Sequence, residues 1–237
     1  MKITTILFDL DGTLLPMNEQ EFVNEYFYLL SKKLTVIGYD KQELVNAVLT
    51  GIAAMVKNDG KKTNEEVFWI EFEKIFGDRV RQDLKYFDEF YQDEFKNIKS
   101  ACGYTEKSRV LIDMIKEMGL RIVCATNPIF PAIATETRMG FAGLSPEDFE
   151  LYTTYENSRH CKPNIEYYKD ILAKIQCTPQ ECLMVGNDAR EDMVAEKLGM
   201  KVFLLTDCLI NKDDIDISKY TQGNFDDLIY YIKNINI

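Results

Sequence analysis

The distribution of apolar positions divides the chain into two kinds of segment. Residues 2–8 (KITTILF) form an apolar run rich in β-branched residues, which predicts a buried strand. From residue 18 to about residue 100, apolar residues instead recur every three or four positions, the spacing of one helix face. Four helices are expected there, at 19–34, 41–57, 64–76 and 80–95, with breaks near Gly38, Gly60 and Gly77.

Strands and helices alternate along the rest of the chain. Short apolar runs predict strands at 120–127, 182–186 and 201–205. Helical periodicity predicts helices at 106–119, 131–140, 164–176, 190–199 and 225–235. The first of these helices has a predicted buried stripe of Val110, Leu111, Met114, Ile115 and Met118. The pairs Ser145–Pro146 and Thr178–Glu181 have the form of helix caps.

Alternation of this kind is typical of βαβ units around a parallel sheet. The predicted fold class is therefore α/β, a doubly wound, Rossmann-like parallel sheet with an all-helical insertion after the first strand. We expect a core domain made of residues 1–15 and 105–237, and a helical cap domain of residues 16–104.

Polar residues gather where the predicted strands end. Asp9 and Asp11 follow the first strand, as a pair of costly charges after a buried run. Thr126 and Asn127 end the strand "RIVCA", and Lys162 lies in the loop after it. The strand "CLMV" ends in Gly186, followed by three further polar candidates, Asn187, Asp188 and Asp192. In open parallel sheets, ligands bind beyond the carboxyl ends of the strands.

These residue types suit phosphoryl transfer. One carboxylate can attack phosphorus, and a second can protonate the leaving group and later activate water. Carboxylates from two strand ends can hold Mg²⁺, while a hydroxyl, backbone amides and a lysine receive the phosphoryl oxygens. A simple turn or a DxD metal motif of the glycosyltransferase type would also account for Asp9 and Asp11. A calcium loop of the EF-hand type does not fit, because a strand precedes the acids and Gly12 comes too early.

The segments "DLDGT", "ATN", "KP" and "VGNDAREDM", in this order, resemble the four motifs of the haloacid dehalogenase (HAD) superfamily. The resemblance spans the core, and the helical insertion is similar to the type-1 cap of phosphatase-like members. It implies a nucleophile and metal ligand at Asp9, and a general acid/base at Asp11 whose backbone carbonyl faces the metal. It also implies phosphate contacts from Thr126, Lys162 and the backbone amides of Leu10 and Asn127.

The fourth motif departs from the family pattern. Members commonly have Gly-Asp there, whereas Asn187 follows Gly186 and the acid comes one place later, at Asp188. Either Asn187 is a neutral metal ligand and Asp188 lies outside the set of direct ligands, or Asp188 binds the metal directly. We favour Asp188, because a dication gains more from a carboxylate, and expect Asp192 to orient a metal-bound water or Lys162.

The remaining features of the sequence restrict partners and compartment. The formal net charge of −11 argues against a broad nucleic-acid surface. No apolar run is long enough for a membrane span, and the N-terminal segment is too short for a signal peptide. Six cysteines without a CxxC pair favour a reduced, cytoplasmic protein. We expect a monomer or weak homodimer that acts on a small phosphorylated metabolite. His160 is expected to be an exposed or packed loop residue, with a substrate contact as the alternative because Lys162 is close in sequence.

The predicted function is Mg²⁺-dependent hydrolysis of a small organic phosphomonoester through a phospho-aspartyl intermediate. A phosphomutase would use the same residues. A dehalogenase fits less well, because carbon–halogen displacement does not require the acid/base group at Asp11. A catalytically silent phosphate-binding or regulatory module remains a third alternative, suggested by Asn187.

Overall fold

A six-stranded, all-parallel sheet forms the centre of the computed structural model, which describes residues 2–235. Its order is β3-β2-β1-β4-β5-β6, so the first strand lies in the middle. The strands are β1 (Thr5–Phe8), β2 (Arg121–Cys124), β3 (Leu151–Tyr152), β4 (Cys182–Gly186), β5 (Lys201–Leu205) and β6 (Thr221–Gly223). The predicted α/β class is confirmed.

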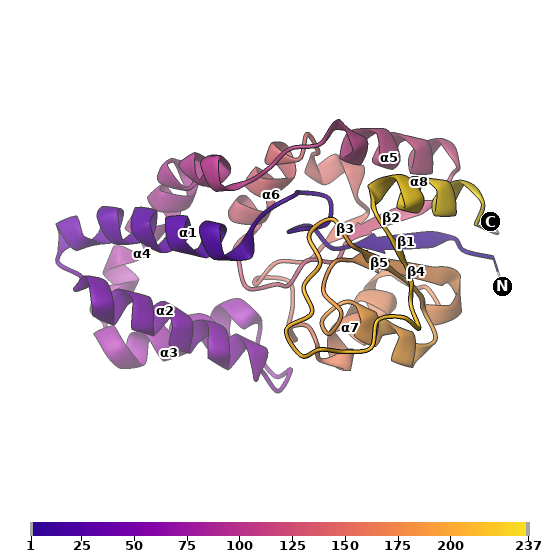
Figure 1. The fold of residues 1–237 in the computed structure, drawn as a ribbon. Coiled ribbons are helices and arrows are strands. Elements are labelled where there is room, and N and C mark those ends of the chain that lie inside the picture. Colours follow the sequence, from indigo (N-terminus) through magenta and orange to yellow (C-terminus); the bar gives the residue numbers. More distant parts are fainter. Residues whose placement is uncertain (1, 236–237) are drawn as a thin grey trace.

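Helices cover both faces of the sheet (Figure 1). Helices α5 (Glu106–Glu117) and α8 (Phe225–Lys233) lie on one face, and α7 (Ile165–Ile175) lies on the other. Successive residues of a strand point to opposite faces. Ile6 and Phe8 accordingly pack in the core beneath α5 and α8, whereas Leu7 packs in the core beside α7. Strands buried on both faces explain why the sequence shows continuous apolar runs.

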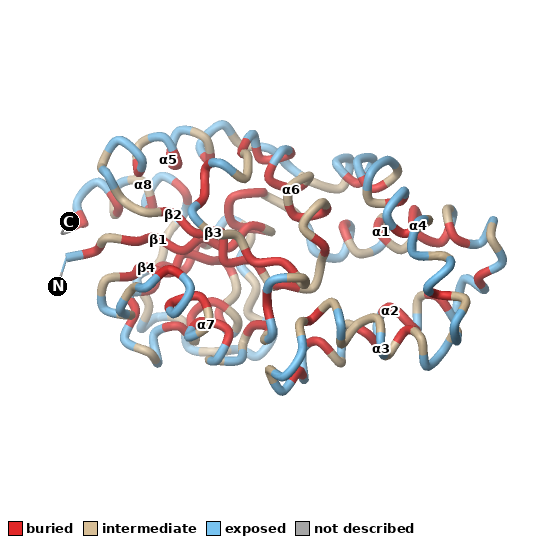
Figure 2. The backbone as a smooth tube through the Cα atoms, turned by 180° about the vertical axis from the view of Figure 1, so that it is seen from behind, coloured by how far each residue is buried: buried red, intermediate tan, exposed pale blue. Residues whose placement is uncertain are grey.

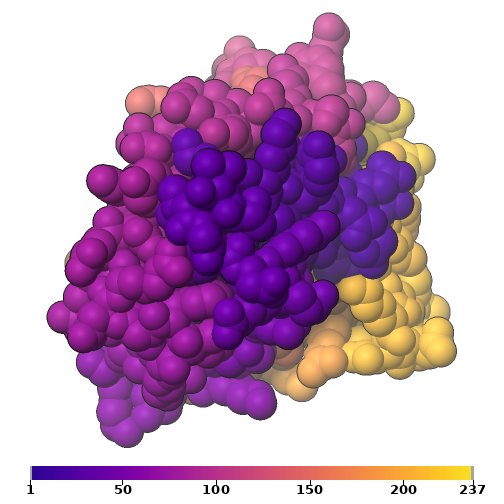
Figure 3. Space-filling view, turned by 90° about the vertical axis from the view of Figure 1, so that its left-hand side faces the viewer, coloured from indigo at the N-terminus to yellow at the C-terminus, as the bar shows by residue number. Residues whose placement is uncertain are grey.

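A helical segment, residues 16–104, extends beyond one end of the sheet, away from both chain termini (Figures 1 and 2). It contains α1 (Glu19–Leu34), α2 (Lys41–Val56), α3 (Asn64–Phe76) and α4 (Arg79–Gln92), with the 3₁₀ helices η1 (Thr35–Ile37) and η2 (Glu94–Ala101). From the side it makes up most of the visible face, in indigo and magenta (Figure 3). The division into core and cap domains stays a prediction.

Several local predictions were wrong. Instead of a helix at 190–199, a turn leads into the short 3₁₀ helix η5 (Met193–Leu198), because the backbone between residues 188 and 192 is used in a capped turn. Val110 is exposed, and the buried face of α5 is formed by Leu111, Ile112 and Ile115. Strands β3 and β6 lie at the sheet edges and are too short to show periodicity.

The remaining elements complete the frame of the site. Helix α6 (Ala132–Phe141) follows β2, and the predicted caps begin two short 3₁₀ helices, η3 (Pro146–Asp148) and η4 (Pro179–Glu181), each with a capping box. In the described part of the chain, no helix combines the length and the apolar character needed to cross a membrane.

Candidate active site

Asp9 is the first residue after the central strand β1. Its side chain is held from two sides: Lys162 Nζ donates to Oδ1 at 2.8 Å, and Thr13 Oγ1 donates to Oδ2 at 3.2 Å. The residue is only 7% exposed. Since β1 lies between β2 and β4, residues from both neighbouring strand ends can reach this carboxylate.

Lys162 joins two carboxylates in the interior. Its ammonium also donates to Asp192 Oδ1 at 2.6 Å, and the side chains of Lys162 and Asp192 are both 1% exposed. Burial alone would lower the pKa of Lys162, but the charges of Asp192 and Asp9 raise it well above its usual value. The lysine therefore remains a cation between two carboxylates. The role expected of Asp192, to orient a metal-bound water or Lys162, stays a prediction.

Two glycines make room for these contacts. A Cβ on Gly186 would lie 2.1 Å from Asp192 Oδ2, so only glycine lets that carboxylate approach the end of β4. A Cβ on Gly12 would lie 2.3 Å from Asn187 Nδ2, and Gly12 has a φ of +82°. Gly12 thus allows the ends of β1 and β4 to approach each other, and Gly186 allows Asp192 to fold back against the end of its own strand.

Asp11 is bound by a residue that sequence reasoning missed. Arg138, from α6, forms an ion pair with Asp11 Oδ2, and the arginine side chain is 1% exposed. Asp11 Oδ1 is buried and has no hydrogen-bond partner within the described structure. Burial raises the pKa of Asp11, while the charge of Arg138 acts in the opposite direction. The sequence signal that could have identified Arg138 is its helical spacing from Ala134 and Phe141, which places it on the buried face of α6.

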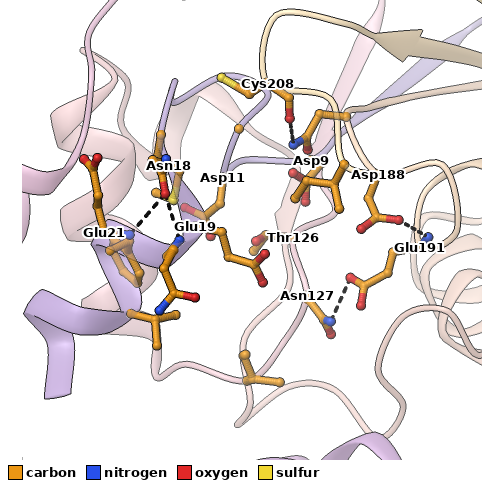
Figure 4. A pocket seen from close by; sticks show the side chains of 18 of the residues that line it. Asp9, Asp11, Asn18, Glu19, Glu21, Thr126, Asn127, Asp188, Glu191 and Cys208 are labelled. Atoms are coloured by element: carbon orange, nitrogen blue, oxygen red, sulfur yellow. Dashed lines mark hydrogen bonds between the residues drawn. The ribbon is translucent and has the colours of Figure 1, made fainter. Parts of the chain in front are cut away.

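In the fourth motif, Asn187 and not Asp188 shares a hydrogen-bond partner with Asp9. Thr13 Oγ1, which bonds to Asp9, also donates to Asn187 Oδ1 at 3.1 Å, and Asn187 Nδ2 donates to the Cys208 carbonyl at 2.7 Å. Asp188 Oδ1 instead accepts hydrogen bonds from the backbone amides of Arg190 and Glu191 at 2.7 and 2.8 Å; Figure 4 shows one bond to this carboxylate. These contacts favour Asn187 as the oxygen donor beside Asp9.

Thr126 and Asn127 follow β2 on the other side of Asp9. The Thr126 carbonyl accepts hydrogen bonds from Thr153 Oγ1 at 2.6 Å and Tyr167 Oη at 2.8 Å, which hold the strand end rigidly. Asn127 Nδ2 donates to Glu191 Oε2 at 3.0 Å. Burial raises the pKa of Glu191 to about 8, against the effect of Lys162. Glu191 is a second pocket residue that sequence reasoning did not single out.

A cavity of about 1300 Å³ opens above these side chains. Asp9, Asp11, Thr126, Asn127 and Asp188 all line it (Figure 4). Leu10 does not line it; its side chain is fully buried and its carbonyl accepts the amides of Thr13 and Leu15. His160 does not line the cavity either, and its Nδ1 contacts Asp170 Oδ2 at 2.8 Å.

The donor atoms suit a hard cation. Asp9 Oδ2 and Asn187 Oδ1 are oxygens that share one hydroxyl, and Mg²⁺ prefers oxygen ligands while keeping several waters. Residues 2–235 contain no group of three or more His, Cys, Asp or Glu side chains placed to hold a metal. A metal ion at this site would therefore need the Asn187 amide oxygen, water and substrate oxygens as ligands, in addition to the Asp9 carboxylate.

Comparisons with known proteins give consistent results. A family model of haloacid dehalogenase-like hydrolases matches residues 3–199. Pyrophosphatase PpaX of Bacillus mycoides (strain KBAB4) is 24% identical over 240 residues, covering 100% of both chains. The solved 2-haloacid dehalogenase of Pseudomonas syringae pv. Tomato DC3000 is 15% identical with a TM-score of 0.66, covering 98% of each chain. The HAD-hydrolase YfnB of Bacillus subtilis, bound to magnesium, is 19% identical with a TM-score of 0.58, covering 99% of this chain and 100% of that one.

At these identities, the two solved structures show a shared fold and nothing more about the chemistry. The family is assigned from the family model. Its match includes β1 to β4 and the edge of the sheet where Asp9, Lys162 and Asn187 meet. The chain therefore belongs to the haloacid dehalogenase-like hydrolase family, as its four motifs indicated.

Proposed function

We propose that this protein is a Mg²⁺-dependent phosphatase that hydrolyses a small organic phosphomonoester through a phospho-aspartyl intermediate on Asp9. The supporting observation is the environment of the Asp9 carboxylate, which faces a large cavity between Lys162 on one oxygen and the Thr13–Asn187 pair on the other. A buried cation beside a carboxylate nucleophile offsets the repulsion between that nucleophile and a phosphate.

In this proposal the Asp9 carboxylate attacks phosphorus as the bond to the ester oxygen breaks. Asp11 delivers a proton to the departing oxygen, which leaves as an alcohol. Asp11 then takes a proton from water as that water attacks the phospho-aspartate, which releases inorganic phosphate and restores Asp9. The raised pKa of Asp11 supports its role as the proton donor.

Other residues of the site hold the phosphoryl group and the metal. Thr126, Lys162 and the backbone amides of Leu10 and Asn127 would bind phosphoryl oxygens, as the family resemblance implies. Asp9, the Asp11 carbonyl and Asn187 would hold Mg²⁺, with Asp188 as the alternative ligand and Asp192 behind them. When bound, Mg²⁺ would supply positive charge that stabilises the transferring phosphoryl group.

The helical segment would act as a cap that excludes water from the cavity during the reaction. YfnB, a relative in fold, is described as undergoing interdomain movement, which supports a similar movement here. The name of PpaX supports pyrophosphate as a second candidate substrate. Six free cysteines support a cytoplasmic location.

The direct test is hydrolysis of p-nitrophenyl phosphate with and without Mg²⁺. We expect Asp9→Asn to lower kcat by a factor on the order of 10³ or more, because the nucleophile is lost while the shape is kept. Asp226→Asn, at an exposed acid in α8, is the matched control and should retain full activity. Equal activity of Asp9→Asn and the wild type would exclude the proposed mechanism.

A further inference from the structure

One wall of the active-site cavity is apolar. Helices α1 and α2 and the loop after β2 supply it with Val23, Phe27, Leu49, Ile52, Val56 and Phe130. Leu49 is 49% exposed and Val56 is 42% exposed, although both line the cavity. Single exposed apolar residues are ordinary, but several apolar side chains that line one pocket from two helices and a loop favour the binding of apolar groups there.

The two buried cations of the cavity, Lys162 and Arg138, are both already paired with carboxylates. Among its described lining residues, four are cations, and every one has a carboxylate partner: Lys162 with Asp9 and Asp192, Arg138 with Asp11, Arg190 with Asp213 and Lys212 with Glu19. Further acids line it as well, namely Glu21, Asp188, Glu191 and Asp207. Arg190 and Lys212 are exposed, whereas a second anionic group bound next to Asp11 would lose hydration beside cations that are already paired.

The reactive floor and the apolar wall meet at Asp11. Its partner Arg138 lies over the ring of Phe130, with 4.6 Å between guanidinium carbon and ring centroid, and 5.9 Å from the ring of Phe22 in α1. In the proposed mechanism Asp11 protonates the leaving oxygen. The organic moiety attached to that oxygen therefore begins beside these aromatic rings and continues toward α1 and α2.

We infer that the substrate is a phosphomonoester whose organic moiety is uncharged and apolar, an alkyl or aryl group that lies against α1 and α2. The inference rests on the proposed phosphatase function and narrows its substrate class. It predicts that compounds with a second anionic group next to the transferred phosphate, such as inorganic pyrophosphate or phosphoglycolate, are poorer substrates than alkyl or aryl phosphates.

The main comparison is between methyl phosphate and hexyl phosphate, whose leaving alcohols have similar acidity. A fully buried methylene is worth about a fourfold change in binding. We therefore expect kcat/KM for hexyl phosphate to exceed that for methyl phosphate by roughly tenfold or more, since its five extra methylenes are partly buried. Phosphoglycolate and inorganic pyrophosphate should both be poorer substrates than hexyl phosphate.

A matched pair of variants locates the effect. Leu49→Glu, on the apolar wall, should reduce the hexyl-to-methyl ratio of kcat/KM at least fivefold. Leu84→Glu introduces the same charge on α4, at a leucine that is 37% exposed and outside the cavity, and should keep the wild-type ratio. Because the readout is a ratio, loss of folded protein lowers both rates equally and leaves it unchanged.

Each outcome separates this inference from the proposed function. If p-nitrophenyl phosphate is hydrolysed but pyrophosphate or phosphoglycolate is preferred to hexyl phosphate, the inferred substrate class is wrong and the phosphatase function stands. A hexyl-to-methyl ratio near one, or an equal fall of that ratio in Leu49→Glu and Leu84→Glu, also overturns the inference. Absence of hydrolysis of all esters above the Asp9→Asn background overturns both.

Discussion

At the scale of the residue, the neighbouring positions Asn187 and Asp188 are the two candidates for the metal ligand of the fourth motif. The Asn187 amide oxygen shares the Thr13 hydroxyl with Asp9, whereas Asp188 Oδ1 is already bound to two backbone amides. A carboxylate would have been the stronger ligand on charge alone, which is why the sequence favoured Asp188. The turn after β4 instead gives that carboxylate a capping role.

The metal dependence of two variants tests this assignment. Asp188→Asn should keep the apparent Kd for Mg²⁺ within about threefold, because asparagine retains the capping oxygen. Asn187→Asp should tighten Mg²⁺ binding by about tenfold, because it adds a full charge beside Asp9. Calorimetric titration with Mg²⁺ measures both. Weakening by more than tenfold in Asp188→Asn would instead identify Asp188 as the ligand.

At the scale of the element, a buried acid joins α5 to η3. Asp148 accepts Arg109 Nη1 at 2.7 Å and also pairs with Lys116. Burial would raise the pKa of Asp148, but the hydrogen bonds from Arg109 and Lys116 outweigh it and lower the pKa to about 2. A lowered carboxylate pKa stabilises the fold above the pKa of the unfolded chain, near 4, and this stabilisation is lost as the pH falls toward 2.

Asp148→Asn should therefore lower the free energy of unfolding by about 1 kcal/mol at pH 7, a value reduced for the screening of the partly exposed Arg109 and Lys116. The difference from wild type should shrink toward zero near pH 2. Urea denaturation at both pH values measures it, and Asp226→Asn, whose pair with Lys107 is exposed, should change stability by less than about 0.5 kcal/mol. A difference independent of pH would contradict the ion-pair explanation.

At the scale of the whole molecule, the start of α3 attaches the helical segment to the core. The Asn64 side chain is fully buried and donates to the Pro128 carbonyl at 3.1 Å and to Cys161 Sγ at 3.3 Å, next to Lys162. The backbone amide of Asn64 donates to the Ser158 carbonyl at 2.8 Å. These bonds connect the segment to the loops that follow β2 and precede α7.

Removing that attachment should loosen the segment. The side-chain amide of Asn58 donates to Asn64 Oδ1 at 2.8 Å. Asn64→Ala removes this acceptor and also the donor to the Pro128 carbonyl. The substitution should therefore lower the free energy of unfolding by about 1–3 kcal/mol. Hydrogen exchange at the backbone amides of residues 64 and 65 should accelerate. Asn46→Ala, at an exposed position of α2, is the control. Unchanged exchange in Asn64→Ala would show that other contacts hold the segment.

The sequence alone determined which residues stand at the strand ends and which elements lie between them. Apolar runs with a period of two, or buried on both faces, are local signals, and so are the motifs around Asp9, Thr126, Lys162 and Gly186. Short edge strands such as β3 carry too few residues for such a signal, and the turn at Asp188 replaced most of a predicted helix.

Only the tertiary structure decided which polar atoms meet. The pairs Asp11–Arg138 and Thr13–Asn187 join residues 127 and 174 positions apart, and no local period encodes their contact. The apolar wall likewise exists only because α1 and α2 face the same cavity as Asp9. Local propensity selects helices and strands, but the choice among buried polar partners depends on packing and desolvation across the whole fold.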